Sequence, residues 1–300
     1  MKKNKKIICF GEVLWDVFPS HKKIGGAPLN VALRLNSFGN EVWVISRIGR
    51  DEPGNTLLDF IQNAGIHTGL IQWDDALGTG EVKVTLDAKG SAAYEIIAPR
   101  AFDRISLNKD CMAAVEKADV FIFGSLITRD AVSGHTLFSL LKKAPFKVFD
   151  VNLRAPFYEK EMLLQLMQEA DFIKFNDDEL FEIAKMMHSK FHSLEQNIQF
   201  IAAQTETKMI CVTKGSHGAV LLFNHHLYYN SGYRIAVRDT VGAGDSFLAA
   251  LIHQLIQGET PQKAIDFACA VGALVASEEG ANPALSLDSI VRFMDPEKSA

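Results

Sequence analysis

The chain reads DTVGAGDSF at residues 239–247, directly before the apolar run LAALI at 248–252. This pattern predicts a helix that begins at the glycines, where backbone N–H groups lack partners and the positive end of the helix dipole attracts anions. Glycine lets a phosphate approach the backbone, and Asp245 in the first turn could accept a proton from an attacking hydroxyl. The stretch therefore favours phosphoryl transfer to an alcohol. An ordinary glycine-rich turn with an aspartate at the helix start is the alternative.

The composition is that of a globular protein that acts on small molecules. With 300 residues, of which 48% are hydrophobic, the chain can bury a large core as one large or two ordinary domains. A net charge of −5 gives no electrostatic reason to expect nucleic acid or an anionic membrane as partner. The four cysteines are far apart in sequence and predict buried thiols in a reducing compartment. Without a signal-like or membrane-spanning segment, we expect a cytoplasmic protein.

Short apolar runs recur along the chain and predict strands that are buried on both faces of a sheet. They lie at residues 7–10, 42–45, 120–123, 147–149, 172–173 and 209–212. Helical patterns lie between most of them, for example at residues 30–35, 56–61 and 136–141. This alternation predicts an α/β fold with a mostly parallel sheet and helices on both faces.

Two segments depart from that alternation. Residues 81–86 alternate polar and apolar side chains, a turn is predicted at 87–90, and residues 94–97 return as the second strand of a hairpin. Residues 13–18 are a further strand candidate. Together they predict a small sheet that covers a site or pairs with another subunit, with an ordinary edge hairpin as the alternative.

A second glycine stretch, GGAPLN, occupies residues 25–30 and is followed by Gly39 and Gly49. Glycines before a helix can present their backbone to a ligand, and the amide of Asn30 could bind hydroxyls; a plain turn and helix start is the alternative. Neither the GxGxxG dinucleotide fingerprint nor a GxxxxGK[ST] phosphate loop occurs here, so the usual Rossmann and P-loop mechanisms have no sequence support.

The two glycine stretches together resemble the two signatures of the PfkB (ribokinase-like) family of sugar kinases, in that family's order, and the resemblance covers roughly residues 6–285. It implies a ribokinase-like three-layer α/β/α fold with a central, mostly parallel sheet and a small β-sheet lid. It also implies a single kinase domain over residues 1–300, with lid strands at about 12–19 and 79–98. The activity implied is transfer of the γ-phosphoryl group of Mg-ATP to a sugar hydroxyl.

Family motifs imply individual roles. Asp245 would be the general base, and the backbone amides of Gly242, Ala243 and Gly244 would form the anion hole for the transferred phosphoryl group. The implied sugar ligands are Asp16, Gly25, Gly26, Asn30, Phe102 and Arg154. For Asp16 a solvated strand residue is the alternative. Arg154 could instead face the phosphates or be an ordinary surface arginine.

The nucleotide side is implied by two more motifs. NDDE at residues 176–179 matches the family's NxxE element, in which Glu179 would hold a water of hydrated Mg²⁺; a helix capping box between Asn176 and Glu179 is the alternative. TKGSHG at residues 213–218 resembles the nucleotide loop. It implies ATP contacts from Asn176, Glu179, Thr213, Lys214, Gly215 and Gly218, with Gly272 beside the adenine. Many relatives also hold K⁺, for which Asp239 and Thr240 are the candidates here.

Fructose is the substrate implied by GEVLWDVFP at residues 11–19 and APRAFD at 98–103, which look most like the fructokinase branch. A 2-keto-3-deoxygluconate kinase is the closest alternative, with Arg100 or Arg154 to bind the substrate carboxylate, and a ribokinase-type enzyme is another. A non-catalytic sugar- or nucleotide-sensing protein is the hypothesis from a different class. The lid sheet is also a candidate surface for a homodimer.

Overall fold

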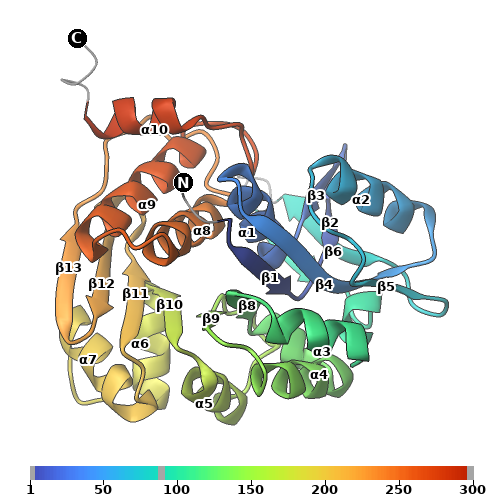
Figure 1. The fold of residues 1–300 in the computed structure, drawn as a ribbon, viewed down its shortest axis with the longest axis horizontal. Helices are drawn as coiled ribbons and strands as arrows, with labels where there is room; N and C mark the ends of the chain where they lie inside the picture. Colours follow the sequence, from blue (N-terminus) through green and yellow to red (C-terminus); the bar gives the residue numbers. More distant parts are fainter. Residues whose placement is uncertain (1–3, 87–91, 296–300) are drawn as a thin grey trace. The chain divides into compact units, whose positions relative to one another are not determined.

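The protein divides into two compact units in the computed structural model, which describes residues 4–86 and 92–295. One unit is formed by Lys6–Pro145 and the other chiefly by Phe146–Ala300 (Figure 1). The turn predicted at residues 87–90 lies outside the described residues. The assignment of residues 1–300 to a single domain stays a prediction.

The main sheet of the N-terminal unit is parallel, with neighbouring strands in the order β8-β1-β4-β5. Three of its strands confirm the apolar runs predicted from sequence, whereas β5 was not predicted, because its short IQWD segment is half polar. The strands are β1 (Lys6–Phe10), β4 (Glu41–Gly49), β5 (Ile71–Asp74) and β8 (Val120–Gly124). Residues 7–10 of β1 are fully buried, as expected for a strand with neighbours on both edges.

Four helices accompany this sheet: α1 (Ala27–Ser37), α2 (Glu52–Asn63), α3 (Lys109–Glu116) and α4 (Ala131–Leu141). The helix patterns expected at residues 30–35, 56–61 and 136–141 are thus confirmed.

The two glycines that follow α1, Gly39 and Gly49, are each favoured for a different physical reason. Gly39 has a φ of +81° just past the end of α1, a conformation that favours glycine. At Gly49, a Cβ would lie only 2.6 Å from the Thr79 backbone nitrogen, so close packing excludes a side chain.

A separate small sheet has the strand order β3-β2-β6-β7. Its strands are β2 (Leu14–Val17), β3 (Lys22–Gly25), β6 (Gly80–Leu86) and β7 (Ala92–Ile96). The predicted hairpin and the strand near residues 13–18 are confirmed: β6 and β7 are antiparallel, and β2 adds to β6 in parallel. Strand β3 was not predicted because KKIG has little β-sheet propensity; it pairs antiparallel with β2.

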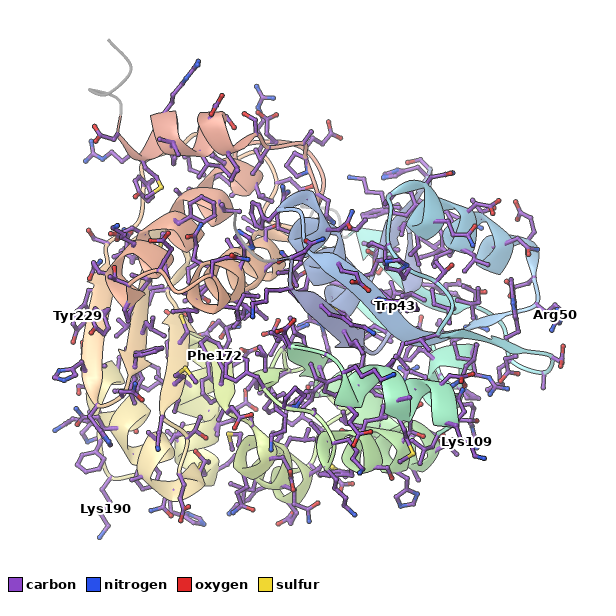
Figure 2. All side chains as sticks on the ribbon, viewed as in Figure 1. Trp43, Arg50, Lys109, Phe172, Lys190 and Tyr229 are labelled. Carbon is purple, nitrogen blue, oxygen red and sulfur yellow. The ribbon has the colours of Figure 1, made fainter. Side chains whose placement is uncertain are left out.

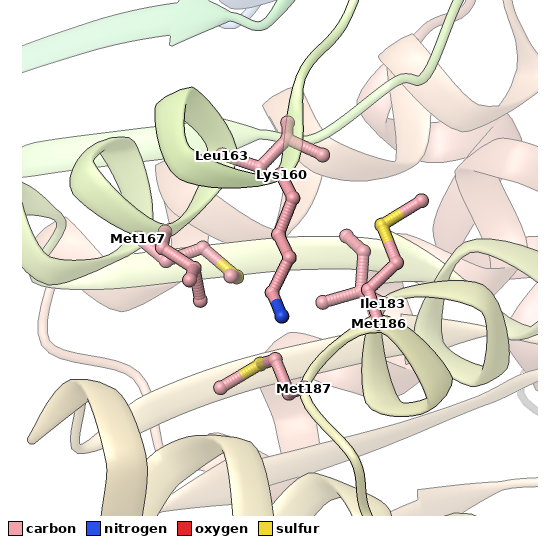
Figure 3. A pocket seen from close by; sticks show the side chains of 7 residues that line it. Lys160, Leu163, Met167, Ile183, Met186 and Met187 are labelled. Atoms are coloured by element: carbon pink, nitrogen blue, oxygen red, sulfur yellow. The ribbon is translucent and has the colours of Figure 1, made fainter.

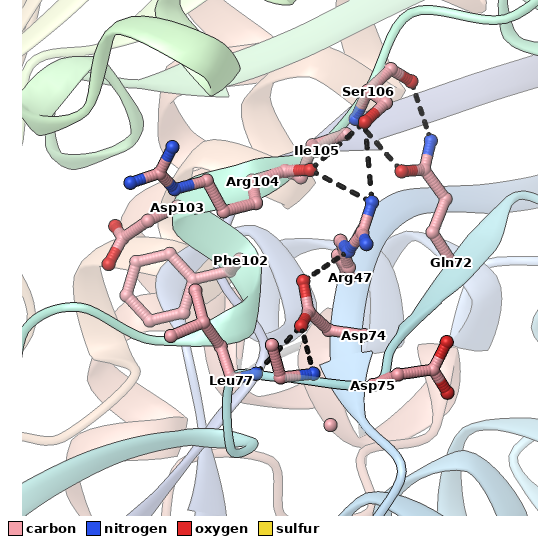
Figure 4. A network of polar contacts seen from close by, with 12 residues as sticks. Arg47, Gln72, Asp74, Asp75, Leu77, Phe102, Asp103, Arg104, Ile105 and Ser106 are labelled. Carbon is pink, nitrogen blue, oxygen red and sulfur yellow. Dashed lines mark hydrogen bonds and ion pairs between the residues drawn. The ribbon is translucent and has the colours of Figure 1, made fainter.

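Polar contacts tie β4 and β5 to the segment after the short 3-10 helix Ala101–Arg104 (Figure 4). Nε of Arg47 lies 2.7 Å from Oδ2 of Asp74, and its Nη1 donates to the Arg104 carbonyl oxygen at 3.2 Å. Oδ1 of Asp74 accepts the backbone N–H groups of Ala76 and Leu77. Burial alone would raise the pKa of the Asp74 carboxyl, but these N–H donors and the Arg47 guanidinium outweigh it, and the pKa is lowered.

In the C-terminal unit, β9, β10 and β11 are parallel, and β12 and β13 continue antiparallel at the edge. The bounds are β9 (Lys147–Asp150), β10 (Phe172–Asn176), β11 (Met209–Thr213), β12 (Ala219–Phe223) and β13 (His226–Asn230). Figure 2 labels one residue inside this sheet and one at its edge: Phe172 of β10 is fully buried, and Tyr229 of β13 is 48% exposed. Strands β12 and β13 form a hairpin, with Asn224 and His225 at positive φ in its turn.

The described residues of this unit form six α-helices: α5 (Lys160–Glu169), α6 (Asp177–Met186), α7 (Leu194–Thr205), α8 (Ala243–Ile256), α9 (Pro261–Ala276) and α10 (Leu287–Met294). The helix expected after the late glycine stretch is α8, and Gly258 at φ +82° follows its end. Thr260 caps α9 by accepting the N–H of Lys263. Helices α8 and α9 lie side by side in Figure 1.

A shallow apolar depression lies between α5 and α6 (Figure 3). It is lined by Lys160, Leu163, Leu164, Met167, Ile183, Met186 and Met187. Methionine is flexible and fills irregular gaps between helices, so these side chains account for the feature as helix packing. Nζ of Lys160 lies 3.5 Å from Nε2 of His188.

Candidate active site

The late glycine turn has the backbone geometry of an anion-binding helix start. Gly242 is the N-cap of α8 with a φ of +75°, and a Cβ there would lie 2.5 Å from the Ala281 carbonyl oxygen. Glycine is therefore required for both conformation and space. The N–H of Ala243 donates to the Thr240 carbonyl oxygen at 3.3 Å, which closes the turn just before the helix. Asp245 lies in the first turn of α8, as predicted.

Asp239 braces this turn. Its Oδ1 accepts the N–H of Val241 at 3.0 Å and its Oδ2 accepts the N–H of Gly280 at 3.2 Å. The N–H of Arg238 donates to the carbonyl oxygen of Ala276, the last residue of α9. Arg238 and Asp239, just before the glycine turn, are thus tied to the end of α9 and to the segment that follows it. The K⁺ role considered for Asp239 and Thr240 stays a prediction.

A buried ammonium lies on the sheet side of the glycine turn. Lys174 is the central residue of β10, and its Nζ donates to Oδ1 of Asp150, the last residue of β9, at 3.0 Å. The two residues pair in the register of the parallel strands, and their side chains are only 8% and 6% exposed. A Cβ placed on Gly244 would lie 3.5 Å from Nζ of Lys174. The ammonium therefore lies next to the predicted anion hole.

Three carboxylates interact electrostatically with the ammonium group of Lys174. Burial alone would lower the pKa of Lys174, but Asp150, Glu179 and Asp245 outweigh it, and the pKa is raised, so the lysine is charged. Oδ2 of Asp150 is buried and accepts no hydrogen bond from the part of the chain that the structure describes. Such an oxygen is normally completed by an ordered water, a cation or a ligand. The three carboxylates also exceed the single ammonium in charge.

This arrangement fits Mg²⁺, which usually binds through one or two carboxylates, several waters and substrate phosphates. Within residues 4–86 and 92–295, no three His, Cys, Asp or Glu side chains converge as a complete metal site. Asp150 and Glu179 are the residues that would hold hydrated Mg²⁺, because their carboxylates lie together around Lys174.

Glu179 forms the capping box that was the alternative reading of its motif. Its Oε2 accepts the N–H of Asn176, and Oδ1 of Asn176 accepts the N–H of Glu179, both at 2.8 Å. Its Oε1 accepts the N–H of Leu153 at 2.9 Å. Burial raises the pKa of Glu179, with Lys174 acting in the opposite direction. Because the carboxylate turns back onto the backbone, a Mg²⁺-bound water would share oxygens already used in the cap; that role stays a prediction.

The segment between Asp150 and α5 carries Arg154, which is exposed and donates from Nη1 to the neighbouring Leu153 carbonyl oxygen. Asn152 adopts a φ of +39°. Since Leu153 is hydrogen-bonded to Glu179, the structure brings this segment beside the capping box. It does not separate a phosphate role from a sugar role for Arg154, so both stay predictions.

The predicted nucleotide loop, residues 213–218, connects β11 to β12. The N–H of Lys214 donates to the Gly218 carbonyl oxygen at 2.8 Å, which closes the loop. Gly218 has a φ of +77°, and a Cβ there would collide with the backbone of Asn230. Burial raises the pKa of Cys269 of α9 to about 12, and the positive charge of Lys214 acts in the opposite direction. The loop therefore lies beside α9, which also carries Gly272.

Gly272 lies at the contact between α8 and α9. A Cβ there would lie 3.4 Å from the Ala243 carbonyl oxygen and 3.5 Å from Cβ of Phe247. Helix packing thus accounts for a small residue at this position. Its predicted place beside the adenine of ATP stays a prediction.

The predicted sugar ligands of the N-terminal unit occur on β2, β3 and α1. Asp16 of β2 lies against Gly25 of β3, and a Cβ on Gly25 would collide with Oδ2 of Asp16. Gly26 has a φ of +111°, and a Cβ there would lie 2.5 Å from the Glu12 carbonyl oxygen. Asn30 follows in the first turn of α1 and is 6% exposed. The structure thus brings the Asp16 carboxylate onto the glycine stretch.

Phe102, the remaining predicted sugar contact, is fully buried. Its ring lies 4.6 Å from the guanidinium carbon of Arg129, which pairs with Asp103 through Nε at 2.7 Å and Nη2 at 2.9 Å. Nη2 of Arg129 also donates to the Ile97 carbonyl oxygen, just after β7. Phe102 therefore belongs to a packed support under the small sheet, and its sugar contact stays a prediction.

The family description "pfkB family carbohydrate kinase" matches residues 2–287. The chain belongs to this family. Among curated relatives, it is 25% identical to Fructokinase-1 of Oryza sativa subsp. japonica over 98% of both chains. It is 27% identical to Probable fructokinase-6, chloroplastic, of Arabidopsis thaliana, over 93% of this chain and 79% of that one. This pfkB family member is an ATP-dependent sugar kinase.

Solved structures confirm the ribokinase-like α/β fold. Fructokinase with bound ATP from Xylella fastidiosa superposes with a TM-score of 0.86 at 24% identity, covering 99% of this chain and all of that one. The 2-dehydro-3-deoxygluconokinase from Thermotoga maritima reaches a TM-score of 0.82 at 22% identity, covering 97% and 98%. A fructokinase double mutant from Vibrio cholerae, bound to fructose, ADP and potassium ion, reaches 0.84 at 21%, covering 98% and 100%.

Lys174 was missed by the sequence analysis, although a signal was present. A lysine at the centre of FIKFN, inside a strand predicted to be buried on both faces, requires a buried counter-charge. Asp150 supplies it from the end of the neighbouring strand.

No helix among residues 4–86 and 92–295 has the length and apolar character needed to cross a membrane.

Proposed function

We propose that this sugar kinase transfers the γ-phosphoryl group of Mg-ATP to the 6-hydroxyl of D-fructose. The two curated relatives described above, which match nearly the whole chain at 25% to 27% identity, are fructokinases. The observation that carries the proposed chemistry is Asp245 in the first turn of α8, directly after a glycine turn whose conformation excludes a side chain at Gly242.

In this proposal Asp245 accepts the proton of the attacking sugar hydroxyl. A carboxylate within hydrogen-bond reach of that hydroxyl can act as the general base. The backbone N–H groups at Gly242 and Gly244, and that of Ala243 once it leaves the Thr240 carbonyl oxygen, stabilise charge that develops on the transferred phosphoryl group, together with the positive end of the α8 dipole. The chain contributes mainly position and electrostatics, as phosphoryl transfer requires.

Substrate and nucleotide are held by separate residue sets. Asp16, Gly25, Gly26 and Asn30 bind the sugar, because a carboxylate and an amide select for substrate hydroxyls that complete their hydrogen bonds. The loop at residues 213–218 binds ATP. Mg²⁺, when bound, neutralises charge on the phosphates; Glu179 and Asp150 would hold it through water. K⁺ beside Asp239 and Thr240 is also part of the proposal, in line with the potassium-bound Vibrio cholerae fructokinase.

A 2-keto-3-deoxygluconate kinase is the second candidate, because the chain shares its fold with the Thermotoga maritima enzyme. That substrate needs a cation for its carboxylate. Nη2 of Arg100 already pairs with Oε2 of Glu81 at 3.1 Å, whereas Arg154 is exposed. Arg154 is therefore the better placed of the two arginines for this role. A ribokinase-type acceptor and a non-catalytic sensor are weaker candidates, the latter because Asp245 and both turn glycines are present.

The test is a steady-state comparison of fructose, ribose, 2-keto-3-deoxygluconate and adenosine as acceptors with Mg-ATP. We expect the highest kcat/KM for fructose. A clear preference for another acceptor would reject fructose and keep the kinase chemistry, whereas no turnover with any acceptor would favour the sensor. Arg154→Ala serves as a check, since it should lower activity with 2-keto-3-deoxygluconate if that acid is the substrate.

A homodimer through the small sheet and a cytoplasmic location belong to the same proposal. Tyr94 of β7 is 59% exposed, so the sheet presents an aromatic side chain that a partner subunit could cover. Light scattering of the wild-type chain and of Tyr94→Ser tests this. We expect a dimer that is weakened by the substitution.

A further inference from the structure

The ion pair between Lys174 and Asp150 is not needed to hold the sheet together. Both residues belong to parallel strands whose backbones already pair at this register, Phe172 with Val148 and Ile173 with Phe149. Replacing a buried ion pair by apolar residues of similar volume is often neutral or stabilising. A charge retained in such a position calls for a role beyond packing.

The geometry around the ammonium suggests what that role is. Nζ of Lys174 lies beneath Gly244, at 3.5 Å from the position of a Cβ on that residue, and its charge acts on Asp245 and Glu179 as well as on Asp150. It originates from the centre of a buried strand, which gives it a fixed position. Without it, carboxylates at the sheet side of the glycine turn would repel one another.

We propose that Lys174, anchored by Asp150, is a positioning residue for phosphoryl transfer that fixes the Asp245 carboxylate and the first turn of α8 from the sheet side. The inference rests on the proposed role of Asp245. It adds a residue that contacts neither sugar nor nucleotide in this account. A small displacement of a catalytic group can cost a large factor in rate, so loss of this support should appear in kcat.

The variant that tests this is Lys174→Met, which keeps the unbranched side chain up to Cε and removes the ammonium group. Lys185→Met on the exposed face of α6 is the matched control. At a temperature where both variants are folded, we expect kcat of Lys174→Met to fall about tenfold to a hundredfold, by analogy with loss of a preorganised charge. The KM for the sugar should change less than about threefold, since its ligands are elsewhere.

A double-mutant cycle with Asp150→Asn separates positioning from simple charge balance. If Asp150 acts by anchoring Lys174, the double variant should have the kcat of Lys174→Met, because the two residues act as a unit. Recovery of wild-type kcat in the double variant would mean that the pair only balances charge. The cycle is measured at saturating Mg²⁺, because Asp150 is also proposed to hold that ion through water; multiplied losses under this condition would mean that the two residues act independently. Either result overturns the inference.

Hydrogen exchange measured by mass spectrometry supplies a readout without turnover. In Lys174→Met, amides at residues 243–246 should exchange faster than in the wild type, while those of α9 are unchanged; equal acceleration in both helices would indicate general destabilisation and would overturn the inference. If the wild-type chain phosphorylates no sugar, the proposed function fails, and the exchange result still decides whether Lys174 orders this turn.

Discussion

The buried ion pair of the N-terminal unit and that of the C-terminal unit are built differently. In the first, both oxygens of Asp103 accept hydrogen bonds, from Nε and Nη2 of Arg129 and from the N–H of Arg100. In the second, Lys174 contacts a single oxygen of Asp150, and the other oxygen is buried without a donor among the described residues. Both pairs are almost fully buried.

This difference indicates that the pair of Asp103 and Arg129 supports the fold, whereas the pair of Lys174 and Asp150 belongs to the candidate active site. A carboxylate whose oxygens are all satisfied has no remaining affinity for a ligand, so Asp103 and Arg129 account for a fixed junction beneath the small sheet. A buried oxygen without a donor is costly in a folded protein and is normally completed by an ordered water, a ligand or a cation. The second pair lies beside the glycine turn of α8, where the proposed reaction takes place.

Breaking the pair of Asp103 and Arg129, in which both carboxylate oxygens accept hydrogen bonds, should have the largest effect on stability. Asp103→Asn leaves the Arg129 guanidinium buried without its counter-charge, and we expect the free energy of unfolding to fall by about 3 kcal/mol. All three tryptophans, Trp15, Trp43 and Trp73, belong to the N-terminal unit. Urea denaturation followed by tryptophan fluorescence therefore reports on the affected unit. A loss below about 1 kcal/mol would contradict the supporting role.

A second satisfied carboxylate, Asp74, gives an intermediate effect that depends on pH. Its pKa lies below the ordinary value, so its contribution is complete above the unfolded-state pKa of about 3.9 and is lost as pH falls through the lower folded-state pKa. Asp74→Asn should cost about 1 to 2 kcal/mol at pH 7. The difference from wild type should shrink below pH 4. A difference that is constant with pH would refute this account.

The effect on stability should be smallest at the pair of Lys174 and Asp150. In Asp150→Asn the ammonium of Lys174 still faces Glu179 and Asp245, so we expect a loss of no more than about 1 kcal/mol. Thermal unfolding followed by circular dichroism measures it. Asp178→Asn, at an exposed position of α6, is the control. A loss as large as that of Asp103→Asn would remove the contrast between the two pairs.

The fold can be predicted from the sequence where the signal is local. Apolar runs predicted the central strands, the late glycine stretch predicted the start of α8, and the alternation at residues 81–86 predicted β6. Strands β3 and β5 were missed because KKIG and IQWD owe their pairing to neighbours that are distant in sequence.

The candidate site could be predicted only in part for the same reason. The glycines and Asp245 form one contiguous stretch, so their chemistry is visible in the sequence. The pair of Lys174 and Asp150 joins residues 24 positions apart, and only the strand register brings them together. From the sequence, Glu179 could hold a Mg²⁺-bound water or form a capping box with Asn176. The capping box depends on the orientation of the Glu179 side chain, which the sequence does not determine.

The role of Asp245 is tested most directly by the kcat of Asp245→Asn with fructose and Mg-ATP. Asparagine keeps the shape of aspartate but cannot accept the proton, so we expect kcat to fall at least about a hundredfold while fructose binding, measured by calorimetry, persists. Turnover close to that of the wild type would contradict the assignment of Asp245 as the general base.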